Sequence, residues 1–262
     1  MRILISNDDG IEANGIRVLS QALAREQEVY VVAPDRERSA AGHALTLHTP
    51  LRVEEVEPFD GVKKCWKTSG TPGDCIKIAV CAILEKNDQP DLIISGINHG
   101  PNFASDILSS GTVSCAMEGS MFGIPSIAVS LASLRFEEEN FRFAAQFIVG
   151  LIKKLEKYKF EPKTVLNVNV PALSPDDIAG VAVVPLGDKT FTNTYEKRID
   201  PRGKVYYWLA GELVNNPKEV DTDIAAVRSN KISITPISYD LTKRDLMPAL
   251  DEILCGDGTC NW

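Results

Sequence analysis

The sequence predicts an α/β protein in which helices flank a doubly wound, mostly parallel sheet. The chain opens with an apolar run at 2–6, a segment of helical periodicity at 14–25 and a second apolar run at 28–33. This strand–helix–strand order is typical of the first unit of a parallel sheet. The chain has 262 residues, 44% of them apolar, which is enough to enclose a large core.

The same alternation continues to about residue 172. Further strands are expected at 46–54, 63–68, 91–95, 126–131 and 164–170, and further helices at 72–84, 112–122 and 141–157. Thr71 is a good N-cap for the first of these helices, and Pro72 suits its first turn.

The chain changes character after about residue 172. Short strand-like segments at 181–185, 205–209 and 232–235 are separated by polar turns. We therefore expect a core formed by residues 1–172 and a β-rich C-terminal extension formed by residues 173–262. The extension would be used for hairpins or for contacts between subunits.

The charge of the chain limits its partners. Formal net charge is −8 and the pI is about 5.0, so a broad cationic surface for nucleic-acid polymers or anionic membranes is not expected. No apolar run reaches the ~20 residues that span a bilayer, and the N-terminal residues lack the pattern of a secretion signal. We expect a cytoplasmic protein that binds neither nucleic-acid polymers nor membranes.

Six cysteines stand at positions 65, 75, 81, 115, 255 and 260. None forms a CxxC pair, and three histidines are too few for a Cys/His zinc site. Free thiols are expected in a cytoplasmic protein, several of them in the core. Cys255 and Cys260 lie in a Gly-rich tail, where they could instead pair.

Three polar clusters follow expected strands, at 7–10, 36–39 and 96–102. Ligands bind beyond the carboxyl ends of the strands in open α/β sheets, so these clusters should converge. In the first, the adjacent carboxylates of Asp8 and Asp9 repel each other unless a cation neutralises them. Their hard oxygen atoms favour Mg²⁺, Mn²⁺ or Ca²⁺. Asp-Asp-Gly is also common in turns, and a plain turn is the alternative.

Ser39 and Asn98 lie in the other two clusters and could supply neutral oxygen ligands to the same ion, although each could equally be a solvated or turn residue. An anion site is expected at 109–112, Ser-Ser-Gly-Thr, because hydroxyls and backbone N–H groups at a helix N-terminus bind anions. An ordinary N-cap at or near Thr112 is the alternative. The chain lacks GxxxxGK[ST], GxSxG, and GxGxxG after the first strand, which removes the usual support for triphosphatase, serine hydrolase and dinucleotide functions.

The three histidines are less informative. Histidine titrates near neutral pH and can act as a general acid. His43 and His99 lie in loops of the candidate site, where either could donate a proton to a leaving group or contact phosphate. His48 lies in a strand-like run and is expected to be structural.

Several segments of the chain match a known family in order. They are ILISNDDGIEANGI at 3–16, VVAPDRERSAAGHALTL at 31–47, SGTPGDCI at 69–76, DLIISGINHGPN at 91–102, SSGTVSCAMEG at 109–119, LNVNVP at 166–171 and ISITPI at 232–237. Together they resemble the SurE family of stationary-phase survival proteins and 5'-nucleotidases. The matches are dense over the N-terminal two thirds and looser in the C-terminal third. NDDG combined with SGIN-G-N is the specific part.

The resemblance implies a Rossmann-like three-layer core and a C-terminal extension that exchanges arms in a homodimer, often within a homotetramer. It implies one divalent metal ion per subunit, Mg²⁺ or Mn²⁺, held by Asp8, Asp9, Ser39 and Asn98. It also implies a phosphate pocket formed by Asn102, Ser110, Gly111 and Thr112. The implied activity is hydrolysis of nucleoside 5'-monophosphates, and also of 3'-monophosphates and short polyphosphate.

The expected mechanism is hydrolysis by a water molecule that the metal ion activates. Two carboxylates bring charge −2 to a 2+ ion, and coordination positions remain for water and a phosphate oxygen. Asp8 or Asp9 is the expected catalytic base, and direct attack by water is preferred because a metal-bound carboxylate is a poor nucleophile. Two other functions fit the residues: a metal-dependent glycosyltransferase, whose carboxylates are usually one residue apart, and a nucleotide-sensing module that binds without turnover.

Overall fold

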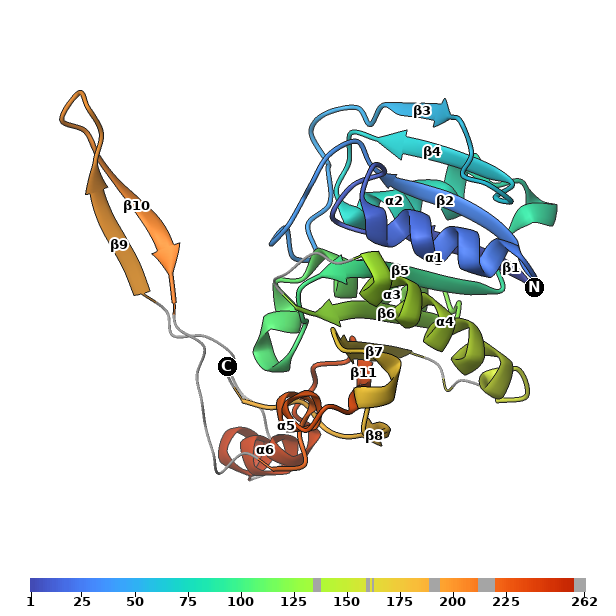
Figure 1. Cartoon of the computed structure of the whole chain (residues 1–262). Coiled ribbons are helices and arrows are strands. Elements are labelled where there is room, and N and C mark those ends of the chain that lie inside the picture. The colour runs from blue at the N-terminus through green and yellow to red at the C-terminus, as the bar shows by residue number, and fades with distance from the viewer. Residues whose placement is uncertain (134–137, 159–160, 162, 189–193, 212–219, 257–262) are drawn as a thin grey trace.

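The computed structural model describes residues 1–133, 138–158, 161, 163–188, 194–211 and 220–256. Its central feature is a nine-stranded sheet with the strand order β3-β4-β2-β1-β5-β6-β7-β11-β8 (Figure 1). The strands are β1 (Arg2–Ser6), β2 (Glu28–Pro34), β3 (Val53–Val56), β4 (Lys64–Thr68), β5 (Leu92–His99), β6 (Ser126–Ala132), β7 (Thr164–Pro171), β8 (Val181–Val183) and β11 (Ile232–Ser238). The β3–β4 and β7–β11 pairs are antiparallel, and the six other neighbouring pairs are parallel.

The chain builds this sheet outward from β1 in two directions. β2 and β4 extend it on one side, after which the chain returns and adds β5, β6 and β7 on the other. The direction of growth therefore reverses between β1 and β5. In open α/β sheets the carboxyl ends of the strands at such a reversal are where ligands bind.

Helices cover both faces of the sheet. On one face α1 (Asn14–Ala24) packs beside α4 (Glu138–Leu155), and on the other α2 (Pro72–Ile78) packs beside α3 (Gly111–Met121) (Figure 1). The predicted three-layer α/β fold is confirmed.

The sequence of β1 explains how one strand serves two cores. Successive side chains of a strand point to opposite faces. Ile3 and Ile5 accordingly pack in the core shared with α1 and α4, whereas Leu4 packs in the core shared with α2. All three side chains are fully buried, and each contributes about 2 kcal/mol through the hydrophobic effect. β1 is thereby fixed in the middle of the sheet, and the residues that follow it are held at one place.

Three predicted elements differ in their limits. The strand expected at 46–54 begins only at Val53, and the helix expected to reach Leu84 ends as α2 at Ile78, followed by a π-helical turn at Ala79–Ile83. Residues 46–52 are held differently from a strand, because the Thr46 N–H bonds to a side chain, that of Asp74. Thr71 caps α2 as expected.

The third difference concerns the start of α3. Its N-cap is Ser110, whose Oγ accepts a hydrogen bond of 3.1 Å from the Val113 N–H, so the helix begins at Gly111. Thr112 therefore lies within the first turn, and its hydroxyl does not cap the helix.

The C-terminal region divides into parts with different surroundings. β8 and β11 join the main sheet, so strands from both sides of residue 172 share it. The hairpin of β9 (Thr194–Ile199) and β10 (Val205–Ala210) stands away from the sheet (Figure 1). α5 (Asp223–Arg228) packs against β11, and α6 (Met247–Cys255) comes after β11 in the chain. The β-rich character that the sequence predicts is present, together with the two helices, which it did not predict.

The cysteines only partly meet the expectation of free thiols. Cys65, Cys75 and Cys115 are free and buried, and Cys81 is free and exposed. Cys255, whose state the sequence leaves open, is disulfide-bonded, and Cys260 lies outside the described residues.

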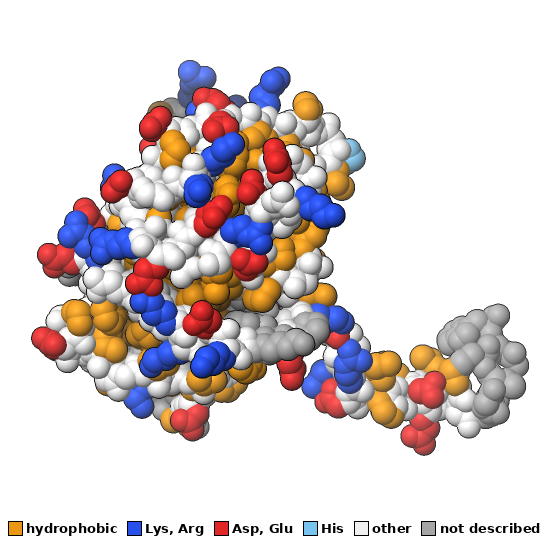
Figure 2. All heavy atoms as spheres, turned by 90° about the vertical axis from the view of Figure 1, so that its right-hand side faces the viewer, with side chains coloured by type: hydrophobic (Ala, Val, Ile, Leu, Met, Phe, Trp, Pro, Cys, Tyr) orange, Lys and Arg blue, Asp and Glu red, His pale blue; other side chains and the backbone are white. Residues whose placement is uncertain are grey.

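The surface carries charges of both signs. On the face in Figure 2, basic and acidic side chains are interspersed with apolar ones rather than gathered by sign. Within the described part of the chain, no helix is both long enough and apolar enough to cross a bilayer.

Candidate functional site

The loops that follow β1, β2 and β5 converge at the carboxyl end of the sheet, where the strand order reverses. The Arg38 N–H donates a 2.7 Å hydrogen bond to the carbonyl of Asp8 and so joins the first two loops. The His99 N–H donates a 3.3 Å bond to Asp9 Oδ2 and joins the first to β5. The convergence predicted from the three polar clusters is present.

A tight turn places the two carboxylates. Asn7 closes this turn with both ends of its side-chain amide: Nδ2 donates to the Gly10 carbonyl at 2.9 Å, and Oδ1 accepts from the Gly10 N–H at 3.2 Å. Gly10 has φ of +97°, and a Cβ there would lie 3.0 Å from the backbone carbon of Arg36, so glycine is required. Asn7 and Gly10 make the turn, and the side chains of Asp8 and Asp9 are left for another role.

Asp8 lies against the first turn of α3. The Thr112 hydroxyl donates to Asp8 Oδ1, and a Cβ at Gly111 would lie only 2.6 Å from the Cβ of Asp8. Any larger side chain at position 111 would push the helix away from the carboxylate. The carboxylate pair was predicted as a metal site and the N-terminus of α3 as an anion site. The structure brings the two into direct contact through Asp8.

The environment disfavours negative charge on both carboxyl groups. Burial raises the pKa of Asp8 to about 6, the charge of Asp9 adds to the effect, and the Thr112 hydroxyl bond opposes it. Burial likewise raises the pKa of Asp9 to about 6, with the His99 amide opposing and Glu37 adding. Among the described residues, neither carboxylate has an ion-pair partner. Two adjacent carboxylates without a cation fit a divalent metal ion, which would neutralise both.

Asn98 follows an irregularity in β5. The pairing of β5 with β6 shifts between Ser95 and Asn98, and such a bulge re-aims the side chains that follow it. Gly96 is required there, because a Cβ would lie 2.3 Å from the Val129 carbonyl oxygen. The Asn98 Nδ2 donates to the Gly100 carbonyl at 2.9 Å, and the next residue, His99, donates its N–H to Asp9, so the backbone at Asn98 lies beside the carboxylate pair.

Ser39 is the least constrained of the predicted ligands. It is exposed, and its Oγ donates a 2.7 Å hydrogen bond to Glu37 Oε1. The structure places it one residue after Arg38, whose N–H bonds to Asp8, and records no contact between the Ser39 side chain and either carboxylate. Its side chain would have to turn from Glu37 to act as a ligand.

The predicted phosphate residues are placed unequally. Ser110, Gly111 and Thr112 form the start of α3 beside Asp8. Asn102 is buried, and one N–H of its Nδ2 donates to Ser130 Oγ at 2.7 Å. An amide nitrogen has two N–H groups, so this bond orients the Asn102 side chain and uses one of its two donors.

The histidines take different roles from those considered. His43 Nε2 donates to Glu118 Oε2 at 2.8 Å, and Lys77 Nζ donates to Glu118 Oε1 at 2.6 Å. The His99 ring packs against that of Phe141, with ring centroids 4.8 Å apart. His48 was expected to be structural in a strand, but it lies exposed in the loop before β3.

Sequence reasoning missed Glu118 and the buried polar residues of β7. Glu118 lies inside a segment that matches the family, and only its pairing in the fold with Lys77 and His43 distinguishes it. Asn167 and Asn169 bond to the backbone of Asn102, as described below. Their signal was available, since two asparagines at a spacing of two in the apolar strand LNVNV place two polar groups on one buried face.

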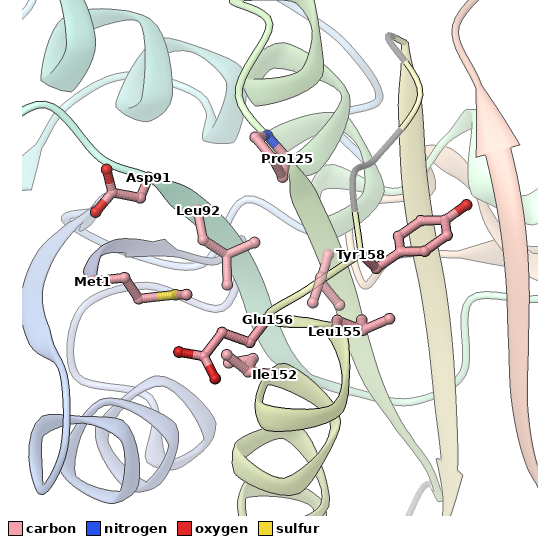
Figure 3. A pocket seen from close by; sticks show the side chains of 9 residues that line it. Met1, Asp91, Leu92, Pro125, Ile152, Leu155, Glu156 and Tyr158 are labelled. Atoms are coloured by element: carbon pink, nitrogen blue, oxygen red, sulfur yellow. The ribbon is translucent and has the colours of Figure 1, made fainter.

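A small pocket lies at the other end of the sheet. Its lining includes Met1, Asp91 and Pro125, which directly precede β1, β5 and β6 (Figure 3). It is therefore at the amino ends of these strands, away from the carboxylate pair. Ile152, Leu155 and Tyr158 line it from the end of α4 and the residues that follow (Figure 3).

The fold and the site define a doubly wound α/β protein with a carboxylate pair beside a helix N-terminus at the reversal of strand order. Residues 3–193 match the family described as Survival protein SurE, and the chain belongs to this family. It is 52% identical to the 5'-nucleotidase SurE of Thermosynechococcus vestitus over 92% of each chain, and 48% identical to that of Pelotomaculum thermopropionicum over 97% of this chain and 95% of the relative. The crystal structure of the SurE protein from Aquifex aeolicus superposes with a TM-score of 0.83 at 38% identity, covering 97% of this chain and 99% of that one.

Proposed function

We propose that this protein is a divalent-metal-dependent phosphatase that hydrolyses nucleoside 5'-monophosphates. The observation that carries the proposal is the contact between Asp8 and the N-terminus of α3. It joins a carboxylate pair in need of a cation to a helix N-terminus suited to a phosphate anion. The curated relatives named above are 5'-nucleotidases, which supports the same activity in a chain about half identical to them.

The metal would be held by Asp8, Asp9, Ser39 and Asn98. All four side chains offer oxygen atoms, the preferred ligands of Mg²⁺ and Mn²⁺, and the first two supply the compensating charge. One ion per subunit suits a set with only two carboxylates. When bound, the ion would act as a Lewis acid toward the phosphate and lower the pKa of a coordinated water.

The phosphate would be held at the start of α3. Backbone N–H groups in the first turn of a helix are unpaired within it and carry partial positive charge, so they accept an anion without help from lysine or arginine. Thr112 keeps Asp8 oriented, and Ser110 and Gly111 bring the backbone close to it. Asn102 could join them through the second N–H of the amide that bonds to Ser130.

Proton transfer would fall to one of the two aspartates. Asp8 Oδ1 is bonded to Thr112 and Asp9 Oδ2 to the His99 N–H, so each carboxylate keeps one oxygen for the site. Either could accept the proton of the attacking water. Trapping a phosphorylated aspartate from quenched enzyme would replace direct attack by water with a covalent mechanism.

Phosphate release from AMP and p-nitrophenyl phosphate, with and without Mg²⁺ or Mn²⁺, tests the function. We expect release with metal, loss with EDTA and recovery when metal is returned in excess. Sugar release from a nucleotide sugar would instead support a glycosyltransferase. Binding of AMP and metal without any product would support a nucleotide-sensing module. Assays of 3'-AMP and short polyphosphate define the substrate range.

The β9–β10 hairpin is the proposed subunit contact. Apolar side chains on it are exposed: Tyr195, Ile199, Val205, Tyr206, Tyr207, Trp208 and Leu209. Exposed apolar surface of this extent marks contact sites, and exchange of this arm between subunits in a dimer or tetramer would bury it. Light scattering should give a smaller assembly for Trp208→Glu than for the wild type, with Lys204→Ala as the control on the same hairpin.

Localisation to the cytoplasm stays a prediction from the sequence.

A further inference from the structure

Two buried asparagines of β7 form hydrogen bonds with the backbone of the segment that carries Asn98 and Asn102. Asn169 Oδ1 accepts the Asn102 N–H at 2.8 Å, and Asn169 Nδ2 donates to the Asn102 carbonyl at 3.1 Å. Asn167 Nδ2 donates to the same carbonyl at 2.9 Å. Both asparagines are fully buried, so these bonds are protected from water.

A second hold on this segment comes from the C-terminal region. Asp223, the first residue of α5, is fully buried, and its Oδ2 accepts the Ala104 N–H at 2.9 Å. Its Oδ1 accepts the N–H groups of Gly187 and Ile224, each at 2.8 Å. The carboxylate thus ties the segment after β5 to the segment after β8 and to α5.

The backbone at Ala104 needs such a hold. Its φ is +48°, in the left-handed region that residues with a Cβ adopt at a cost of about 1 kcal/mol or more. A strained residue persists where its surroundings fix it, and Asp223 fixes the Ala104 N–H from one side. Ala104 also begins the 3-10 helix Ala104–Leu108, which leads directly into the Ser110 cap of α3.

The held segment reaches both halves of the candidate site. Toward the metal ligands, the Gly100 N–H bonds to the Leu131 carbonyl at 3.0 Å, and Gly100 in turn accepts the Asn98 amide. Toward the phosphate side, the Ser110 N–H bonds to the Ile107 carbonyl at 3.3 Å. A backbone shift at residues 102–104 would therefore displace Asn98 and the start of α3.

We propose that three residues, Asp223, Asn167 and Asn169, are positioning residues. They hold the backbone of the 98–104 segment in the conformation required for catalysis. The C-terminal region would then complete the site of its own subunit, in addition to any role in subunit contacts. This inference rests on the proposed phosphatase function, but the geometric hold it describes can be measured without activity.

The test is Asp223→Asn. Its remaining oxygen can satisfy Gly187 and Ile224 only if its amide group faces the Ala104 N–H, where two donors meet. The matched control is Thr222→Ala, which removes the side-chain cap of the same helix, the acceptor of the Ala225 N–H, and keeps the Asp223 carboxylate. We expect kcat for AMP to fall ~10-fold or more and the half-saturating metal concentration to rise several-fold in Asp223→Asn, and both to stay within twofold of wild type in Thr222→Ala.

Amide hydrogen exchange gives the readout that does not depend on turnover. Asp223→Asn should speed exchange at Ala104 and Asn102 relative to Thr222→Ala. If wild type proves inactive, the proposed function fails, but this exchange result still decides the hold. Equal kcat, metal dependence and exchange in the two variants would overturn the inference. If Asp223→Asn does not fold, Asn169→Asp replaces it, because it keeps the acceptor for Asn102 N–H but loses the donor to its carbonyl. Unchanged metal dependence and exchange in that variant would equally overturn the inference.

Discussion

Helix α3 contacts the buried carboxylate of Asp8 and itself carries a second buried carboxylate, that of Glu118. The two groups have very different surroundings. Asp8, 4% exposed, meets the first turn of the helix, where the Thr112 hydroxyl donates to it. Glu118, 2% exposed, lies further along the helix and is paired with His43 and Lys77. The hydrogen bond from His43, followed by that from Lys77, holds the pKa of Glu118 below its usual value, whereas burial raises that of Asp8.

The difference separates a structural carboxylate from one reserved for a ligand. A buried charge is costly unless it is paired. At Glu118 the chain supplies the cation of Lys77 and a hydrogen bond from His43, and these tie α2 and the loop after β2 to α3. At Asp8 and Asp9 the described residues supply no cation, so neutralisation is left to something that binds. The predictions below test this contrast.

The largest effect is expected at the carboxylate pair. Asp8→Asn or Asp9→Asn should lower turnover of AMP at least ~10³-fold, because each removes a charge that would hold the metal. Thermal unfolding should show the variants at least as stable as metal-free wild type, because one of two repelling charges is gone. Near-normal kcat in both variants would remove the metal-site hypothesis.

Metal binding itself should stabilise the protein. At ~100-fold excess over Kd, Mg²⁺ or Mn²⁺ should add about 3 kcal/mol to the free energy of unfolding, because the ion binds the folded site only. Thermal melts with EDTA and with added metal measure the gain. Asp8→Asn should lose most of it and Glu118→Gln should keep it, and an equal gain in all three proteins would place the ion elsewhere.

Removing the self-neutralised charge should affect stability more than chemistry. Glu118→Gln leaves Lys77 without its counter-ion and weakens the hydrogen bond of His43, and it should cost about 1–3 kcal/mol, reduced by the partial exposure of both partners. Urea unfolding measures the loss. Glu26→Gln, which breaks the surface pair with Lys153, should change stability by less than ~0.5 kcal/mol. Similar losses in the two variants would contradict the structural role.

The stability due to Glu118 should also depend on pH. Its folded pKa lies below the usual 4.5, so the contribution is complete above about pH 4.5 and is lost as pH falls through the lowered folded value. The difference in unfolding free energy between wild type and Glu118→Gln should therefore be constant from pH 7 to about 5 and shrink below that. A difference that grew on acidification would have the wrong sign.

Much of the site was accessible from local sequence because its parts lie next to strand ends. Asp8, Asp9 and Asn98 follow β1 or lie at the end of β5, and parallel strands bring such positions together. Ser39 was also a candidate ligand from its place after β2, and Asn102 was assigned to phosphate by resemblance alone; in the structure their side chains bond to Glu37 and Ser130. Glu118 and Asp223 were not found, because their partners come from segments far apart in the chain.

The sequence by itself determined the α/β class, the carboxylate pair and the alternation of strands and helices up to about residue 172, because these follow from hydrophobic period and from adjacent residues. Only the tertiary structure decided that β8 and β11 complete the main sheet, and that Asp223 and two β7 asparagines hold the Asn102 segment. The physical reason is distance along the chain. Periodicity reports which face of an element is buried, but the partner of a buried polar group is fixed only when distant segments pack together.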